Sequence, residues 1–155
     1  MTYSIKGLDP AAFTFLVGAD EELLASHNAV RVTATAKPGY PCRISLEDAE
    51  PGETLILLNH VSHDVASPYR SSYAIYVREA ADAAASHVDS IPPVFEGRPL
   101  GLRGFDSDGM LRKAMLALPG TADSTIREML VAPEIAYIDA HNAAHGCFAA
   151  RIERD

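Results

Sequence analysis

Two cysteines and one histidine are the residues in this chain best suited to covalent chemistry. Cys147 follows His141 by six positions, whereas Cys42 lies far away in the sequence. A thiol becomes nucleophilic when a neighbouring base or positive charge favours its thiolate form. His141 is the candidate base, and Cys147 or Cys42 the candidate nucleophile, for acyl or thiol chemistry. Strand register decides which side chains meet, and most buried cysteines are inert, so this catalytic interpretation stays open.

Three arginines indicate a second kind of chemistry, the binding of an anion. Arg43, Arg70 and Arg103 each lie beside an expected strand end or loop. The planar guanidinium group makes paired hydrogen bonds to carboxylates and phosphates. Neighbouring side chains offer directional hydrogen bonds that would orient such a ligand. These side chains belong to Tyr69, His141 and Asn142.

Asp106 is the acid in these segments best placed to pair with one of the arginines, and it belongs to the same candidate ligand-binding group. A charged side chain that leaves water needs a partner. We therefore expect the whole group to gather in one neighbourhood, with the remaining arginines around an external anion. The alternative is that the arginines form surface ion pairs with some of the 21 acidic residues. Such pairs contribute little to stability.

The sequence contains none of the common cofactor or metal motifs. The P-loop, GxGxxG, GxSxG, HExxH and CxxC patterns are all missing. His141, His145 and Cys147, with Cys42 as a fourth ligand, have the donor atoms that zinc prefers. Their spacing would suit one helix face, but here it crosses an expected hairpin loop. We therefore expect no metal site and no cofactor.

Composition and charge narrow the class of protein. The chain has 155 residues, 48% hydrophobic and 22% charged, which predicts a single globular domain over residues 1–155. Its net charge of −8 argues against nucleic acid as a partner. No apolar run is long enough for a membrane helix. The first residues lack the pattern of a secretory signal, so we expect a cytoplasmic protein with reduced thiols.

Short elements separated by turn residues must position these side chains. Alternating or apolar runs predict strands at residues 3–6, 30–37, 42–46, 54–58, 73–78, 100–105, 110–118, 135–141 and 147–152. Helices are expected to begin at Pro10 and Glu21 and to cover residues 79–87 and 121–131. The strands come in runs instead of alternating with helices. This order favours an α+β fold with a twisted, mainly antiparallel sheet and a few helices on one face or end.

Several of these segments together are similar to the bacterial domain-of-unknown-function family 1203. They are residues 37–43, 45–53, 67–70, 103–106, 141–142 and 146–147. The resemblance extends from about residue 3 to residue 154. Tyr73 and His145 depart from the family pattern, which has His and Arg at those positions. The resemblance implies a single-domain cytoplasmic protein, and it supplies no activity, cofactor or catalytic residue.

The sequence as a whole predicts a small soluble α+β module that binds a small polar or anionic ligand. One alternative is the Cys–His enzyme described above. The other is a structural homodimeric module without a ligand, in which the same polar residues form a buried network that specifies the core. Side chains that line an open cleft would favour binding, whereas fully buried and mutually bonded side chains would favour the structural alternative.

Overall fold

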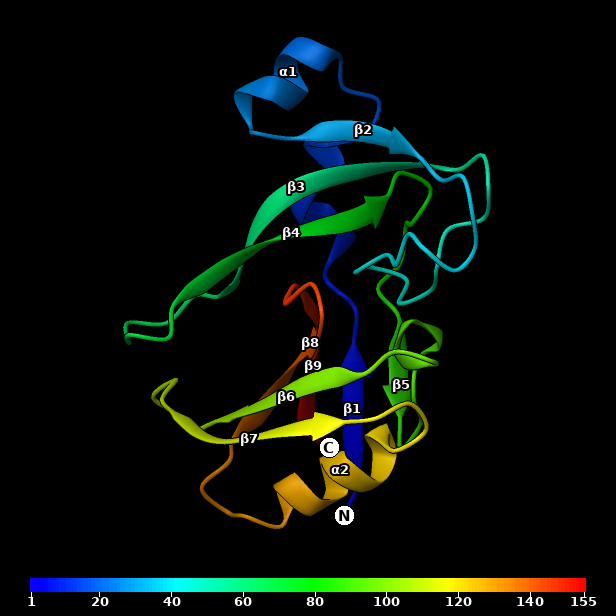
Figure 1. Ribbon diagram of the computed structural model, residues 1–155. Helices are drawn as coiled ribbons and strands as arrows, with labels where there is room; N and C mark the ends of the chain where they lie inside the picture. The colour runs from blue at the N-terminus through cyan, green and yellow to red at the C-terminus, as the bar shows by residue number, and fades with distance from the viewer.

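Two antiparallel sheets lie one above the other in the computed structural model, which describes residues 1–155 (Figure 1). The larger sheet has the strand order β5 (Ser86–Val88), β1 (Tyr3–Lys6), β9 (Phe148–Arg154), β8 (Tyr137–Asn142), β6 (Leu100–Phe105) and β7 (Leu111–Ala117). The smaller sheet consists of β2 (Val30–Thr33), β3 (Thr54–His63) and β4 (Ser71–Arg78). Every pairing is antiparallel, and the expected α+β class is confirmed, with two sheets in place of one.

Helices lie at opposite ends of the molecule. Helix α1 (Glu21–Ser26) lies beyond the small sheet, and α2 (Ala122–Leu130) lies beneath the large one (Figure 1). Asp20 caps α1 by accepting a hydrogen bond from the backbone N–H of Leu23. Short 3₁₀ turns occur at Pro10–Ala12, Thr14–Leu16 and Pro93–Phe95. None of the helices combines the length and the apolar character needed to cross a lipid bilayer.

Strand β6 contributes side chains both to the hydrophobic core and to the polar layer between the sheets. Its side chains alternate between the two faces of the large sheet. Leu100 and Leu102 are fully buried in the core formed with α2. Arg103 lies on the opposite face, which is turned toward the small sheet, and its side chain contacts Tyr73 of β4. One short strand thus supplies both a hydrophobic layer and a polar layer.

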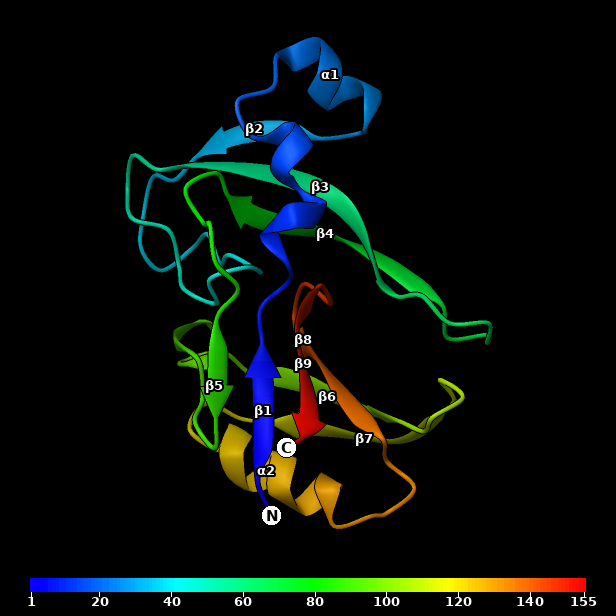
Figure 2. The same cartoon turned by 180° about the vertical axis from the view of Figure 1, so that it is seen from behind.

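The small sheet has an apolar core of its own. Ile56 of β3 and Ile75 and Val77 of β4 pack with Leu24 of α1 and with Phe13. This cluster is separate from the one around α2. The chain passes from β1 upward into the small sheet through the two N-terminal 3₁₀ turns (Figure 2). Polar side chains make most of the hydrogen bonds between the two sheets, as described below.

Four expected elements differ from the structure. Residues 79–87 form no helix: a turn follows β4, and the segment ends in strand β5, which pairs with β1. Strand β2 ends at Thr33, earlier than expected. Residues 42–46 form a turn with only an isolated bridge at Cys42. Strand β3 continues to His63, five residues beyond its expected end at residue 58.

Candidate functional site

The β8–β9 hairpin fixes the relation between the candidate base and the candidate nucleophile. The pairing register shifts between Ala140 and His141, which places His141 opposite Phe148. Asn142 therefore lies opposite Cys147, and its backbone N–H donates to the Cys147 carbonyl over 3.0 Å. His141 donates instead to the carbonyl of Gly146. The two side chains form no Cys–His hydrogen bond, so the pair required by the catalytic alternative is not formed.

His141 is a neutral, buried imidazole. Its side chain is 3% exposed, and burial together with the charges of Arg103 and Arg43 lowers its pKa from 6.5 to about 4, against a smaller opposing effect of the Gly146 hydrogen bond. The Gly146 carbonyl can only accept, so Nδ1, 2.9 Å away, is assigned the proton. Nε2 is then an unprotonated acceptor, and it makes no hydrogen bond within the protein.

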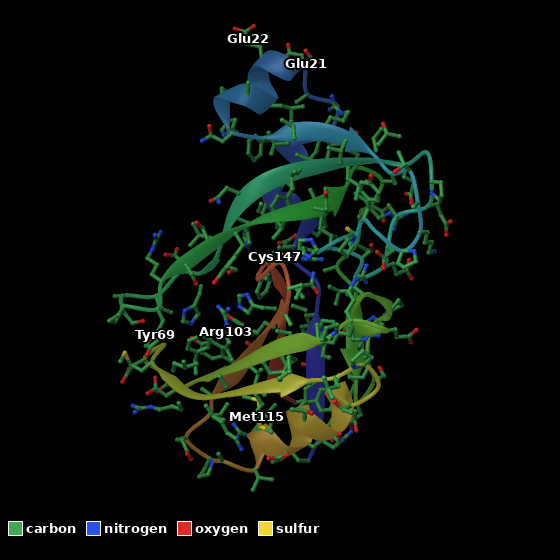
Figure 3. All side chains as sticks on the ribbon, in the orientation of Figure 1. Glu21, Glu22, Tyr69, Arg103, Met115 and Cys147 are labelled. Carbon is green, nitrogen blue, oxygen red and sulfur yellow. The ribbon has the colours of Figure 1, made fainter.

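A cavity of about 350 Å³ lies between β4 and β6, and we call it the inter-sheet cavity. Its walls include Tyr69, Arg70, Tyr73, Arg103, Asp139 and His141. Four of these belong to the predicted ligand-binding group. Figure 3 shows Arg103 in the space between the two strands and Tyr69 toward its outer end.

Arg103 is the cation of this cavity without an acidic partner. In the register of β6 and β8, Asp139 lies directly opposite Arg103. The Asp139 carboxylate is nevertheless bound by Arg151 of β9, through contacts of 2.7 and 3.0 Å. Arg103 donates only to the Tyr73 hydroxyl, over 2.8 Å. The Tyr73 ring packs edge-on against His141, with ring centroids 4.9 Å apart, and so connects the two groups.

Most of the other arginines have a charged or helix-end partner within the protein. Arg154 donates to the carbonyls of Leu130 and Ala132 at the end of α2. Only Arg43 and Arg103 have neither a carboxylate nor a helix end as partner, although the chain has an excess of acids. Both line cavities. Seven of the ten arginines form ion pairs, and these are Arg31, Arg70, Arg78, Arg98, Arg112, Arg127 and Arg151.

Arg70 and Tyr69 occupy the outer end of the inter-sheet cavity. Arg70 pairs with Asp64 over 3.0 Å and remains largely exposed. The Tyr69 backbone carbonyl accepts a hydrogen bond from Nδ1 of His63, whereas no hydrogen bond involves the Tyr69 hydroxyl. Its ring packs edge-on against Phe105. These two side chains form a solvent-facing rim, and Arg103 and His141 form the floor.

A second cavity of about 550 Å³ adjoins the first at Tyr73, and we call it the hairpin cavity. Its walls include Arg43, Tyr73, Tyr76, Asn142, His145 and Cys147. Arg43 is only 1% exposed. Its guanidinium donates to the carbonyls of Phe148 and Pro41 and, from Nη2, to the Cys147 sulfur at 3.4 Å. Burial lowers the pKa of Arg43, and Cys147 acts in the opposite direction.

Asp106 and Cys42 lie outside both cavities, which corrects two expectations. Asp106 pairs with none of the three candidate arginines: it pairs with Arg112 and accepts hydrogen bonds from the backbone of the turn after β6. Cys42 is fully buried, and its sulfur accepts hydrogen bonds from the backbone N–H groups of Ile44 and Arg78. These geometries are those of structural residues. The predicted ligand-binding group without Asp106 therefore occupies two adjoining cavities, not one neighbourhood.

Three residues of the site were not found from the sequence. Tyr73 joins the two cavities, and Arg151 decides the partner of Asp139. His63 lies beyond the expected strand end at residue 58, but it is buried in β3 and bonds to the Tyr137 hydroxyl over 2.7 Å. Only Tyr73 carried a signal, because it shares the alternating face of β4 with Ile75 and Val77. No group of three or more His, Cys, Asp or Glu side chains is placed to hold a metal ion.

Comparison with known proteins adds one match. A family model described as "Protein of unknown function (DUF1203)" matches residues 39–154, which include both cavities apart from Pro38. No curated protein and no solved structure matches the chain.

Proposed function

Because the chain belongs to the DUF1203 family, whose function is unknown, we propose from its geometry that the protein binds a small anionic ligand in the inter-sheet cavity. The observation that carries the proposal is the single cation on the floor of that cavity. Arg103 has one neutral hydrogen-bond partner, and the acid opposite it is already neutralised. A half-buried guanidinium with free donors favours an external carboxylate or phosphate.

The neutral His141 narrows the chemistry of the ligand. Its unprotonated Nε2 can accept a hydrogen bond but cannot donate one. A ligand that satisfies both groups has an anionic oxygen for Arg103 and, beside it, a hydroxyl or N–H donor for His141. Hydroxycarboxylates, amino acids and hydrogen phosphate meet this requirement. A volume of about 350 Å³ suits a small metabolite.

Calorimetric titration with lactate, propionate and inorganic phosphate tests the proposal. Lactate and phosphate should bind more tightly than propionate, which has the carboxylate but no donor. Arg103→Gln should weaken binding by roughly 10- to 100-fold, as expected for loss of a charge-assisted hydrogen bond. Arg112→Gln is the matched control, because it removes the same charge from an exposed arginine of the neighbouring strand. Equal binding by the two variants, or no binding to the native protein, would contradict the proposal.

Three further features belong to this proposal. Both cysteines are free thiols, which supports a reducing compartment such as the cytoplasm. The net charge of −8 supports a module that does not bind nucleic acid. Strand β7 is a free edge of the large sheet. Leu116 in this strand is 60% exposed and Leu118 just beyond it is 57% exposed, which supports pairing of two copies along this edge. Light scattering coupled to gel filtration tests the homodimer: the native protein should have the mass of two chains, and Leu116→Lys the mass of one.

A further inference from the structure

The hairpin cavity contains the Cys147 thiol, which has no part in the proposed anion site at Arg103. Cys147 lies at the tip of the β8–β9 hairpin (Figure 3), is partly exposed, and is one of the residues that line this cavity. Two donors point at the sulfur: Nη2 of Arg43 and Nδ2 of Asn142, each at 3.4 Å. A neutral thiol is a weak acceptor, whereas a thiolate is a strong one. The pair of donors is therefore matched to a negatively charged sulfur.

The charge of Arg43 is available to the sulfur because nothing else neutralises it. Its remaining hydrogen bonds go to backbone carbonyls, and it has no carboxylate partner. The nearby acid, Asp48, is bound by Arg98 through contacts of 2.7 and 2.9 Å. A buried guanidinium without an acid, directed at a cysteine, is the type of positive environment in which reactive cysteines occur.

Asn142 makes the second polar contact to the sulfur. Its Oδ1 is buried and has no hydrogen-bond partner in the protein. With Nδ2 on the sulfur side, as in the structure, the amide donates to a thiolate, whereas a neutral S–H group would instead donate to Oδ1. An unpaired buried carbonyl oxygen is costly. In the observed orientation this cost accompanies two donors directed at the sulfur.

We propose that Cys147 exchanges with small disulfides that carry carboxylates, forming a mixed disulfide in the hairpin cavity. The thiolate sulfur attacks one sulfur of the disulfide, the S–S bond breaks, and the other half leaves as a thiolate that takes a proton from water. Cys147 is oxidised, and the leaving sulfur is reduced. A volume of about 550 Å³ holds a group of peptide size, and the charge of Arg43, which no carboxylate of the protein neutralises, attracts carboxylates to it.

The reaction does not depend on the anion site at Arg103, so the two proposals can fail separately. We would follow the release of thionitrobenzoate from dithiobis-nitrobenzoate, a disulfide with two carboxylates, by the native protein at pH 7. One thiol per chain should react, roughly tenfold faster than N-acetylcysteine amide. Hydroxyethyl disulfide, which is neutral, should show a smaller acceleration. Arg112→Gln, which removes a positive charge from outside both cavities, should leave the rate unchanged.

Variants identify the thiol and its activating groups. Cys147→Ser should abolish the fast reaction, and Cys42→Ser should retain it. Asn142→Ala and Arg43→Lys should each slow it by roughly threefold or more, because each removes a donor to the sulfur. Asn142→Ala keeps the test decisive if the buried Arg43 variant does not fold. A native rate no greater than that of the model thiol, or a fast reaction that survives Cys147→Ser, would overturn the proposal.

Discussion

Arg103 and Asp139 face each other across β6 and β8 but do not form an ion pair. The Asp139 carboxylate turns to Arg151 on the far side, and Arg103 turns to the Tyr73 hydroxyl of the other sheet. Asp139 is 1% exposed, and the Arg151 guanidinium also lies 4.2 Å from the centre of the Tyr137 ring. Asp139 is therefore the only acid opposite Arg103 in the two neighbouring strands, and Arg151 already binds it.

The first prediction follows from this competition. Arg151→Met should free Asp139 to pair with Arg103, and anion affinity should fall by roughly tenfold even though the substituted residue lies outside the inter-sheet cavity. The double variant Arg151→Met with Asp139→Asn removes the competing charge and should recover most of the affinity. Phosphate titration of both folded variants measures the effect. Wild-type affinity in the single variant would show that Asp139 does not compete for Arg103.

A second prediction concerns Tyr73. Tyr73→Phe keeps the ring against His141 but removes the acceptor of the Arg103 hydrogen bond. Loss of that bond should let the guanidinium move and weaken anion binding by roughly 3- to 10-fold. Tyr76→Phe is the matched control on the same strand, because no hydrogen bond involves its hydroxyl. The two variants are compared by titration with phosphate, and an equal loss of affinity in both would argue against a positioning role for Tyr73.

The third prediction is a pH dependence of stability that originates at His141. In the unfolded chain this histidine binds a proton below its ordinary pKa of 6.5, whereas in the folded protein it binds one only below about 4. The unfolded state is therefore favoured as the pH falls from 6.5 to 4. The residue should cost about 2–3 kcal/mol of stability across that interval.

His141→Asn tests this dependence, because asparagine retains a donor for the Gly146 carbonyl but does not titrate. Urea unfolding of wild type and variant at several pH values between 4 and 7 gives the comparison. The variant should lose less stability toward acid than the wild type. Parallel curves for the two proteins would exclude His141 as the source.

A fourth prediction uses two glycines of the same strand. A Cβ at Gly104 would lie 2.9 Å from Ile135 Cδ1 and 3.0 Å from Met129 Cε, in the packed core above α2. Gly104→Ala should therefore lower the free energy of unfolding by about 1–3 kcal/mol. Gly101→Ala meets no atom within 4 Å and should change stability by no more than about 0.5 kcal/mol. Denaturant unfolding of the pair measures the difference, and similar losses in both would contradict the packing argument.

The elements that the sequence predicts well are those whose local signals agree with their tertiary surroundings. Strand β6 has the predicted limits because its apolar and polar residues alternate between a core and a polar layer. The expected helix at residues 79–87 is wrong because its alanines carry only a weak preference, which is too small to nucleate so short a helix. Backbone pairing of His87 with Ile5 determines that segment instead.

The site could be predicted only as a set of residue types. Arginines beside strand ends indicated anion binding, and Arg103 and Arg43 do line cavities. Which arginine is left without an acid depends on the strand order β9–β8–β6, since that order places Asp139 between two cations. Whether His141 meets Cys147 depends on a one-residue bulge. Both are long-range properties that the local pattern does not contain.

Because the molecule has two separate apolar cores, we expect its two halves to open independently of each other. The cluster around α2 is separate from the cluster beneath α1, and hydrogen bonds such as Arg103–Tyr73 and His63–Tyr137 join the two sheets. Segments with separate cores open with separate free energies, and amide hydrogen exchange reports each of them. An occupant of the inter-sheet cavity touches both halves at once. An anion bound as proposed should therefore raise the hydrogen-exchange protection of both sheets together.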